Sequence, residues 1–125
     1  MKKYIPILQE YGKKGPFYFE KFVEHKGLTL TLRDSNNVVI DVFFDNVRCY
    51  RRAEETDIMT TLLEEFGSDG ATKTFYLFTD SAFKRWFNEQ NYNVWITSSL
   101  AHYAIITEDD IFDVLAFDEP LFFSR

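Results

Sequence analysis

Two short alternating segments, separated by a polar turn, most constrain the fold of this chain. In Leu28–Arg33, Leu occupies every second position, with Thr or Arg between. Apolar residues dominate again in Val38–Phe44, and residues 34–37 between the two segments are Asp, Ser, Asn and Asn. Strand side chains alternate between two faces, and Asp and Asn tolerate the left-handed backbone of tight turns. The pattern predicts a β-hairpin with one buried face.

The apolar spacing changes to that of a helix in residues 56–66. Apolar side chains recur there at intervals of three and four, at Met59, Leu62, Leu63 and Phe66. Thr56 is a candidate cap, and Gly67 is expected to end the helix because glycine accepts the left-handed conformation found at helix ends.

A second helix is predicted from Asp80 or Ser81, either of which is a good N-cap, to about Asn91. Its apolar face consists of Phe83, Trp86 and Phe87. We interpret this face as core rather than as a ligand platform, because such a stripe must be buried against something.

Further strands are predicted in residues 17–23, 47–52, 74–79 and 94–99, and a second hairpin in residues 102–117. No secondary structure is predicted for residues 1–16. The residues after Pro120 are expected to pack back onto the body of the protein. The chain is therefore expected to be one α+β domain spanning residues 1–125. Its expected architecture is a mainly antiparallel sheet of five to seven strands with two helices packed on one face.

The composition excludes several classes of protein. With 14 Phe, 7 Tyr and 2 Trp in 125 residues, the chain carries far more aromatic side chains than a disordered protein would. The single cysteine, Cys49, cannot form an internal disulfide, and the N-terminal residues lack the apolar stretch of a secretory signal. No apolar run approaches the roughly 20 residues that cross a bilayer. We therefore expect a cytoplasmic protein that does not span a membrane.

The charge is distributed unevenly along the chain. Residues 1–52 contain ten Lys and Arg against six Asp and Glu, whereas residues 53–125 contain four against fourteen. The net charge of the whole chain is −6. A nucleic-acid-binding protein usually carries a basic stripe, so nucleic-acid binding is disfavoured.

The residues that could carry chemistry form no recognisable motif. The five glycines are too scattered for a phosphate loop, and one Cys with two distant His residues cannot fill a zinc site. Cys49, His102 and Asp113 could together form a nucleophilic site. The better interpretation is that Cys49 is a small core residue and His102 a hydrogen-bonded structural residue. We predict no catalytic, cofactor-binding or metal-binding residue.

The acidic turn at residues 108–110 could bind Ca²⁺ or Mg²⁺ through carboxylate oxygens. The spacing of an EF-hand is missing, however, and strand alternation places Asp110 and Asp113 on opposite sides. We therefore expect a solvated hairpin turn.

The pattern assigns Trp95 to the core less clearly than the other aromatic residues. Trp95 could anchor a partner if its indole is partly exposed.

The segments YRRAEETD, FTDSAFKRWFNEQNYNV and HYAIITEDDIFDVLAFDEP resemble a group of short, poorly characterised bacterial proteins. The resemblance covers Arg48 to Pro120, and its specific part is the last segment. No established activity comes with it. By analogy, small acidic proteins of this kind are sometimes immunity partners of secreted toxins.

We therefore expect a non-enzymatic protein-binding domain, of the immunity or antitoxin kind, that meets a basic partner and needs no cofactor. The alternatives are a small enzyme or small-molecule-binding domain with an unrecognised cleft, and a homo-oligomeric structural protein. Acidic side chains would speed association, and an aromatic side chain would anchor the complex. The candidate surface consists of Glu54, Glu55, Asp57, Trp95, Glu108, Asp109, Asp110, Asp118 and Glu119.

Overall fold

A computed structural model describes residues 3–7, 16–67, 73–94 and 98–124 of the chain. These residues form two antiparallel sheets, two α-helices and one 3-10 helix, which confirms the predicted α+β class. The strands are β1 (Tyr4–Pro6), β2 (Phe17–Glu24), β3 (Leu28–Asp34), β4 (Val39–Phe44), β5 (Val47–Glu54), β6 (Phe75–Phe78), β7 (Ala101–Ile106), β8 (Asp110–Ala116) and β9 (Leu121–Ser124). The helices are η1 (Glu55–Asp57), α2 (Met59–Phe66) and α3 (Ala82–Gln90).

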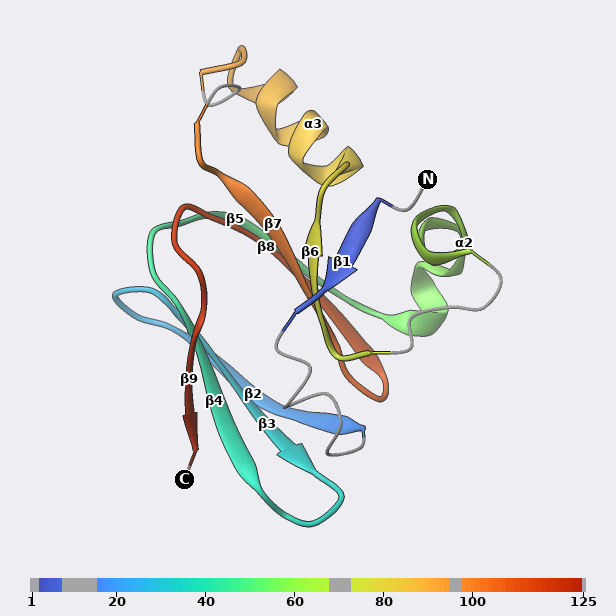
Figure 1. The fold of residues 1–125 in the computed structure, drawn as a ribbon, viewed down its shortest axis with the longest axis vertical. Helices are drawn as coiled ribbons and strands as arrows, with labels where there is room; N and C mark the ends of the chain where they lie inside the picture. Colours follow the sequence, from blue (N-terminus) through green and yellow to red (C-terminus); the bar gives the residue numbers. More distant parts are fainter. Residues whose placement is uncertain (1–2, 8–15, 68–72, 95–97, 125) are drawn as a thin grey trace.

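The strands divide between a five-stranded sheet, in the order β1-β6-β7-β8-β5, and a four-stranded sheet, in the order β2-β3-β4-β9. One face of the five-stranded sheet packs against the four-stranded sheet, and α2 and α3 lie on the other face (Figure 1). The two helices thus share one face, as the sequence predicts. The five-stranded sheet is the middle layer of three.

The hairpin predicted from the alternating segments is confirmed as β3 and β4. Its register pairs Leu30 with Val42 and Leu32 with Ile40, and all four side chains are buried. Asp34 fixes the turn, because its Oδ1 accepts hydrogen bonds from the backbone N–H groups of residues 36 and 38. The alternation of the two strands therefore produces one face of the core.

The main core lies between the two sheets. Leucines of β3 and apolar residues of β4 meet large side chains of the five-stranded sheet, namely Phe75, Tyr103, Ile105, Phe112 and Val114. Burying each such side chain contributes roughly 1.5–3 kcal/mol, so this layer supplies most of the driving force for folding. Both sheets share one continuous core.

The first helix differs from its prediction at the N-terminus. Residues 55–57 form a 3-10 turn, and α2 starts at Met59 without a side-chain cap, so the prediction that Thr56 caps it was wrong. The end at Gly67 is confirmed, because its N–H donates to the carbonyl of Leu63. Phe66 is buried, but Met59 and Leu63 are exposed. Only part of the apolar spacing therefore marks a buried face.

The second helix begins where the sequence predicts. Ser81 is its N-cap and accepts a hydrogen bond from the N–H of Lys84. Phe83 is buried against the sheet, and Phe87 is partly buried. Trp86 is 49% exposed, so the prediction that it belongs to the core was wrong.

Two connections carry the chain between the sheets at the same end of the molecule. The turn at residues 45–46 links β4 to β5, and residues 117–120 link β8 to β9. Asn46 joins them, because its side chain donates to Asp118 and its carbonyl accepts from the N–H of Phe117. Asn46 has a φ of +50°, which allows the chain to turn sharply here. The residues after Pro120 do pack back onto the body, as strand β9 beside β4.

The strand predicted at residues 94–99 lies largely outside the described residues. Its described positions, Val94, Ser98 and Ser99, are not in a strand, and β7 begins at Ala101. No helix in the described part of the chain is long and apolar enough to cross a membrane.

Candidate functional site

A cleft of about 380 Å³ lies between α2 and α3 on the helix-covered side of the five-stranded sheet. It has mixed chemistry, with acidic, basic and aromatic side chains drawn from both helices, from β5 and from the segments around β1 and β6. The lining residues are Lys3, Arg51, Thr61, Glu64, Glu65, Asp80, Ala82, Phe83 and Trp86.

Arg51 on β5 connects the cleft to the buried interior. Its Nε donates to Oδ2 of Asp113 over 2.7 Å, and its Nη2 lies 3.5 Å from a carboxylate oxygen of Glu65. Its guanidinium also stacks over the ring of Phe83, 4.3 Å from the ring centre. The side chain is 40% exposed. Arg51 is therefore held by three neighbours while one part of it faces the cleft.

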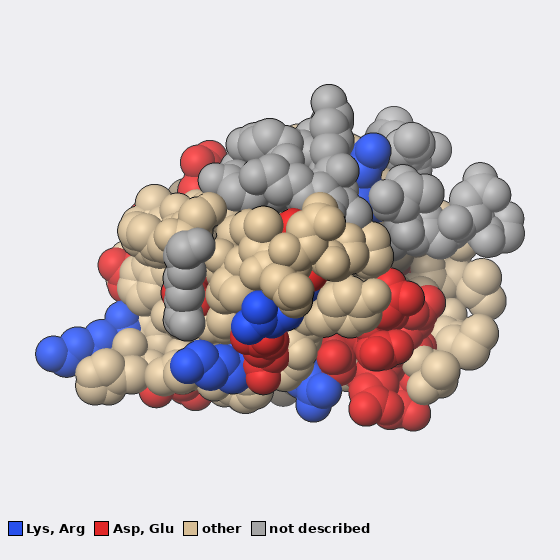
Figure 2. All heavy atoms as spheres, turned by 90° about the horizontal axis from the view of Figure 1, so that it is seen from below, with Lys and Arg blue, Asp and Glu red and all other residues tan. Residues whose placement is uncertain are grey.

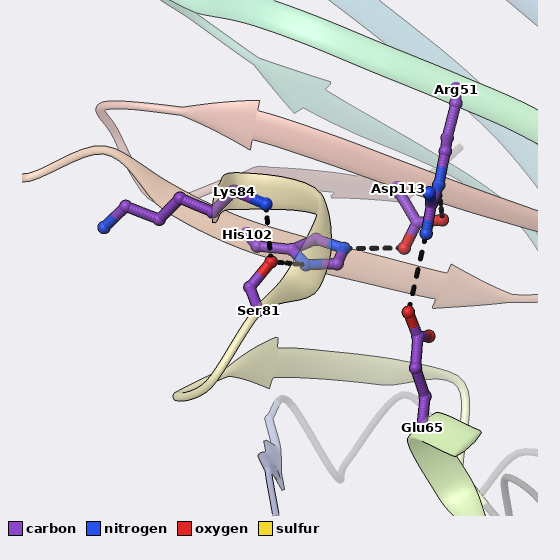
Figure 3. Close-up of polar contacts among 6 residues, drawn as sticks. All are labelled: Arg51, Glu65, Ser81, Lys84, His102 and Asp113. Carbon is purple, nitrogen blue, oxygen red and sulfur yellow. Dashed lines mark hydrogen bonds and ion pairs between the residues drawn. The ribbon is translucent and has the colours of Figure 1, made fainter. Parts of the chain in front are cut away.

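From Arg51, a series of hydrogen bonds runs along the helix-covered face of the sheet to the start of α3 (Figure 3). Nε2 of His102 donates to Oδ1 of Asp113 over 2.6 Å, and Nδ1 of His102 lies 2.6 Å from the hydroxyl oxygen of Ser81. A carboxylate only accepts hydrogen bonds, so Nε2 carries the proton. In the neutral ring, Nδ1 then accepts from the Ser81 hydroxyl, whose oxygen accepts from Lys84 N–H. The polar side-chain atoms of Ser81, His102 and Asp113 therefore all have hydrogen-bond partners.

Aromatic rings fix the orientation of the imidazole. Phe78 stacks on the ring of His102 with a centre-to-centre distance of 4.3 Å, and Phe83 approaches its edge at 5.4 Å. His102 therefore has little freedom to change its partners. The prediction that it is a hydrogen-bonded structural residue agrees with this environment.

Ser81, His102 and Asp113 are the residue types of a serine hydrolase, but their burial limits the chemistry open to them. They are 7%, 1% and 2% exposed, and none of the three lines the cleft. The Ser81 oxygen is also occupied as the cap of α3. In this arrangement the three residues connect the helix to the sheet.

The assembly of Cys49, His102 and Asp113 is not formed in the way that a nucleophilic site requires. Leu115 of β8 pairs with Cys49 of β5 on one side and with His102 of β7 on the other. Adjacent strands lie about 4.8 Å apart, so Cys49 and His102 are separated by about 10 Å across the sheet. Cys49 packs with Phe83 and Leu115, as a core residue does.

Sequence reasoning identified Ser81 as a helix cap but missed its contact with His102. The available signal was a hydroxyl residue shortly after one strand and a histidine near the start of another. Neither feature reveals that the two strands, β6 and β7, are neighbours, with Phe78 opposite His102.

The two carboxylates around Arg51 have opposite electrostatic environments. Burial, together with the nearby Asp113 carboxylate, raises the pKa of Glu65 to about 7, and Arg51 and Lys3 offset only part of this effect. Burial also acts to raise the pKa of Asp113, but the hydrogen bond from His102, together with the charge and hydrogen bond of Arg51, outweighs it and holds that pKa below its usual value. Asp113 is therefore the stable anion, whereas Glu65 exchanges its proton near neutral pH.

Five of the nine candidate surface residues come together at one end of the five-stranded sheet. Glu54 pairs with Asp110 across β5 and β8, and the N–H of Glu55 donates to the carbonyl of Asp109 over 2.9 Å. These contacts bring η1 beside the β7–β8 hairpin. We call the five exposed side chains the acidic end; they are Glu54, Glu55, Asp57, Glu108 and Asp109. Figure 2 shows acidic side chains gathered toward one side of the molecule when it is seen from below.

The other four candidates do not belong to this group. Asp110 is buried and bonded to Nη2 of Arg52 over 2.6 Å, so its assignment to the exposed acidic surface is corrected. Asp118 and Glu119 are exposed but follow β8, at the opposite end of the sheet. Trp95 lies outside the described residues. Only part of the predicted surface is thus contiguous.

Asp110 and Asp113 lie on opposite faces of β8, as alternation predicts: Asp113 bonds His102 on the helix-covered face, and Asp110 bonds Arg52. Among the residues that the structure describes, no group of three or more His, Cys, Asp or Glu side chains is placed to hold a metal ion. No protein-family model, curated protein or solved structure matches the chain.

Proposed function

We propose that the protein is a non-enzymatic protein-binding domain, of the immunity or antitoxin kind, that recognises a basic partner through its acidic end. The observation that carries this proposal is the hydrogen bond from Glu55 N–H to the carbonyl of Asp109, which joins two acidic segments that are far apart in the sequence. Five exposed carboxylates on one small area create a negative potential that attracts a basic surface and speeds association.

Two charge variants test this proposal. The acidic-end variant combines Glu55→Gln, Glu108→Gln and Asp109→Asn. The matched control combines Asp45→Asn, Asp118→Asn and Glu119→Gln, which removes the same charge at the opposite end of the sheet. The wild-type protein and the two variants are each used as bait for affinity capture from a lysate of the native cell. A specific partner is retained by the wild-type protein and the control variant, and is lost or greatly reduced with the acidic-end variant.

The partner so retained is then purified, and its affinity is measured at two salt concentrations. We expect the Kd to rise at least tenfold between about 50 and 300 mM NaCl, because exposed charges are screened over a Debye length of about 10 Å at 0.1 M salt. We also expect the partner to inhibit growth when expressed alone and to become harmless when this protein is co-expressed. A complex that is insensitive to salt, or equal losses with both variants, contradicts the proposal.

A second candidate function is hydrolysis with Ser81 as the nucleophile. The hydrogen-bonded series Ser81–His102–Asp113 favours it, because an imidazole held by a carboxylate can accept the serine proton. An opening of α3 would be needed to expose the hydroxyl, since Ser81 is 7% exposed. Labelling by a fluorophosphonate probe, read by intact mass, tests it. Labelling that disappears in Ser81→Ala supports hydrolysis, and absence of labelling in the folded protein counts against it.

A further inference from the structure

The cleft between α2 and α3 contains a carboxylate whose charge is poorly compensated. Glu65 is only 13% exposed, and its nearest cationic group, the guanidinium of Arg51, is 3.5 Å away. That guanidinium lies closer to Asp113, at 2.7 Å. Asp80, another acid of the cleft, is bonded to Arg85. Glu64, the remaining acid of the cleft, is exposed to solvent, so Glu65 is the acidic group of the cleft that would gain most from a further cation.

The opposite wall of the cleft offers an aromatic surface. Trp86 of α3 is 49% exposed and stacks against Phe83 with an angle of 12° between the rings. An indole face attracts a cation, and the attraction grows when the cation is partly removed from water. A cleft that combines a carboxylate and an exposed indole has the two groups that bind a guanidinium or ammonium group.

We propose that this cleft receives the side chain of an arginine or lysine from the protein partner, with Glu65 pairing with its charge and Trp86 stacking against it. The proposal rests on the function proposed above and names the anchor of that complex. The volume of about 380 Å³ falls within the range of small-ligand sites, which gives room for one long side chain. The helix α2 connects the cleft to the acidic end, because it starts two residues after Asp57 and ends with the acids of the cleft.

An anionic ligand fits the cleft less well. Both of its basic residues, Lys3 and Arg51, already lie near enough to Glu65 to lower its pKa. Arg51 is also committed to Asp113 and to the ring of Phe83. A carboxylate or phosphate would therefore have to compete with these acids for the same two cations, whereas an incoming cation adds a second partner to Glu65, whose ion pair with Arg51 is long.

The probe for the cleft is N-acetylargininamide, and its neutral control is N-acetylcitrullinamide, which has nearly the same shape. Fluorescence of Trp86 is recorded in a Trp95→Phe background. We expect saturable quenching by the arginine compound and at least tenfold weaker binding of the citrulline compound. Glu65→Gln and Trp86→Ala should each weaken binding of the arginine compound at least fivefold, with Trp86→Ala read by NMR line shifts. Glu89→Gln, an exposed acid of α3 that does not line the cleft, should leave it unchanged.

Binding should also strengthen between pH 6 and pH 8, as Glu65 loses its proton. The charged groups that act on this titration are Asp113 of β8, Arg51 of β5, Lys3 before β1 and Glu64 of α2. Equal binding of both compounds, or an unchanged affinity in Glu65→Gln, overturns the assignment. Tighter binding of N-acetylglutamate than of the arginine compound also overturns this assignment of the cleft.

The same cleft variants are finally tested against the purified protein partner. Weaker partner binding by Glu65→Gln and Trp86→Ala supports the anchor. If these variants bind the partner normally while the acidic-end variant does not, the anchor is wrong and the proposed function stands. If no partner is retained by any bait, the proposed function fails. If the arginine compound binds but no bait retains a protein partner, the cleft is a site for a free amine or guanidine, and the proposed anchor is overturned.

Discussion

Nε2 of His102 donates to Oδ1 of Asp113 over 2.6 Å, and both side chains are at most 2% exposed. A buried carboxylate is strongly unfavourable unless its oxygens are satisfied, and here the second oxygen accepts from Nε of Arg51. Together with Arg51, the pair therefore links three strands, β7, β8 and β5, on the face that carries the helices. Removing Asp113 would leave Nε2 of His102 buried without an acceptor, and removing His102 would leave one buried oxygen of Asp113 without a donor.

Asp113→Asn should destabilise the protein by about 1–3 kcal/mol, because the amide has only one acceptor oxygen and leaves the N–H of His102 or of Arg51 without an acceptor. The folded-state pKa of Asp113 is lowered, so its stabilising contribution is present above the usual value of 3.8 and is lost as the pH falls below it. Urea unfolding at several pH values measures both effects. Asp109→Asn at the exposed turn is the control and should change stability by less than about 0.5 kcal/mol.

Ser81→Ala should cost about 2–4 kcal/mol. The substitution removes the cap of α3, worth roughly 0.5–2 kcal/mol, and leaves Nδ1 of His102 without its hydroxyl partner, at a cost of roughly 1–3 kcal/mol. Thermal and urea unfolding provide the measurement, with the exposed Ser99→Ala as control. A loss no larger than that of the control would mean that the hydrogen bond to His102 contributes nothing.

Glu65→Gln should change the pH dependence of stability. The folded protein holds the Glu65 proton up to a pKa of about 7, whereas the unfolded chain releases it near 4.5, so stability falls as pH rises through this window. The total loss is on the order of 3 kcal/mol. Glu65→Gln cannot ionise and should unfold at higher urea concentration than the wild-type protein at pH 8, with a smaller difference at pH 5. Parallel pH profiles of the two proteins would contradict the raised pKa.

Gly27→Ala should destabilise the β2–β3 turn by about 3 kcal/mol or more. Gly27 has a φ of +122°, and an added Cβ would lie 2.6 Å from the ring of Phe43 and 2.8 Å from the carbonyl oxygen of Phe44. Gly67 is the matched control, since its φ is +75° and nothing lies within 4 Å of an added Cβ. Because its ψ is −172°, a backbone region that is essentially confined to glycine, Gly67→Ala should cost about 1–3 kcal/mol from backbone strain alone. Equal unfolding midpoints would show that the contact with Phe43 relaxes freely.

The sequence predicted the elements whose signals are local. The alternation in Leu28–Arg33 and the polar residues after it specify β3, its turn and β4 within a single stretch of chain. Ser81 marked the start of α3 because a cap acts on the backbone three residues away. Such features depend on neighbours in the chain, and they are the features that pattern analysis detects.

The division into two sheets and the polar chain under α3 depend on contacts that no local pattern records. β5 pairs with β8 across more than 50 residues, and this register places Arg51 opposite Asp113. It also places Arg52 within reach of Asp110, which the sequence had assigned to the surface. The exposure of Trp86 has a similar origin, since helical spacing shows which residues share a face but not how far the sheet below extends.

The pairing of the strands also bears on how the protein emerges from the ribosome. β2, β3 and β4 are consecutive and pair with one another, so this meander can form while the rest of the chain is still being synthesised. The five-stranded sheet cannot, because β5 must wait for β8 and β1 for β6. The apolar face of the early meander therefore stays uncovered until about residue 116 has been translated, and nascent chains halted before that point should engage chaperones or aggregate.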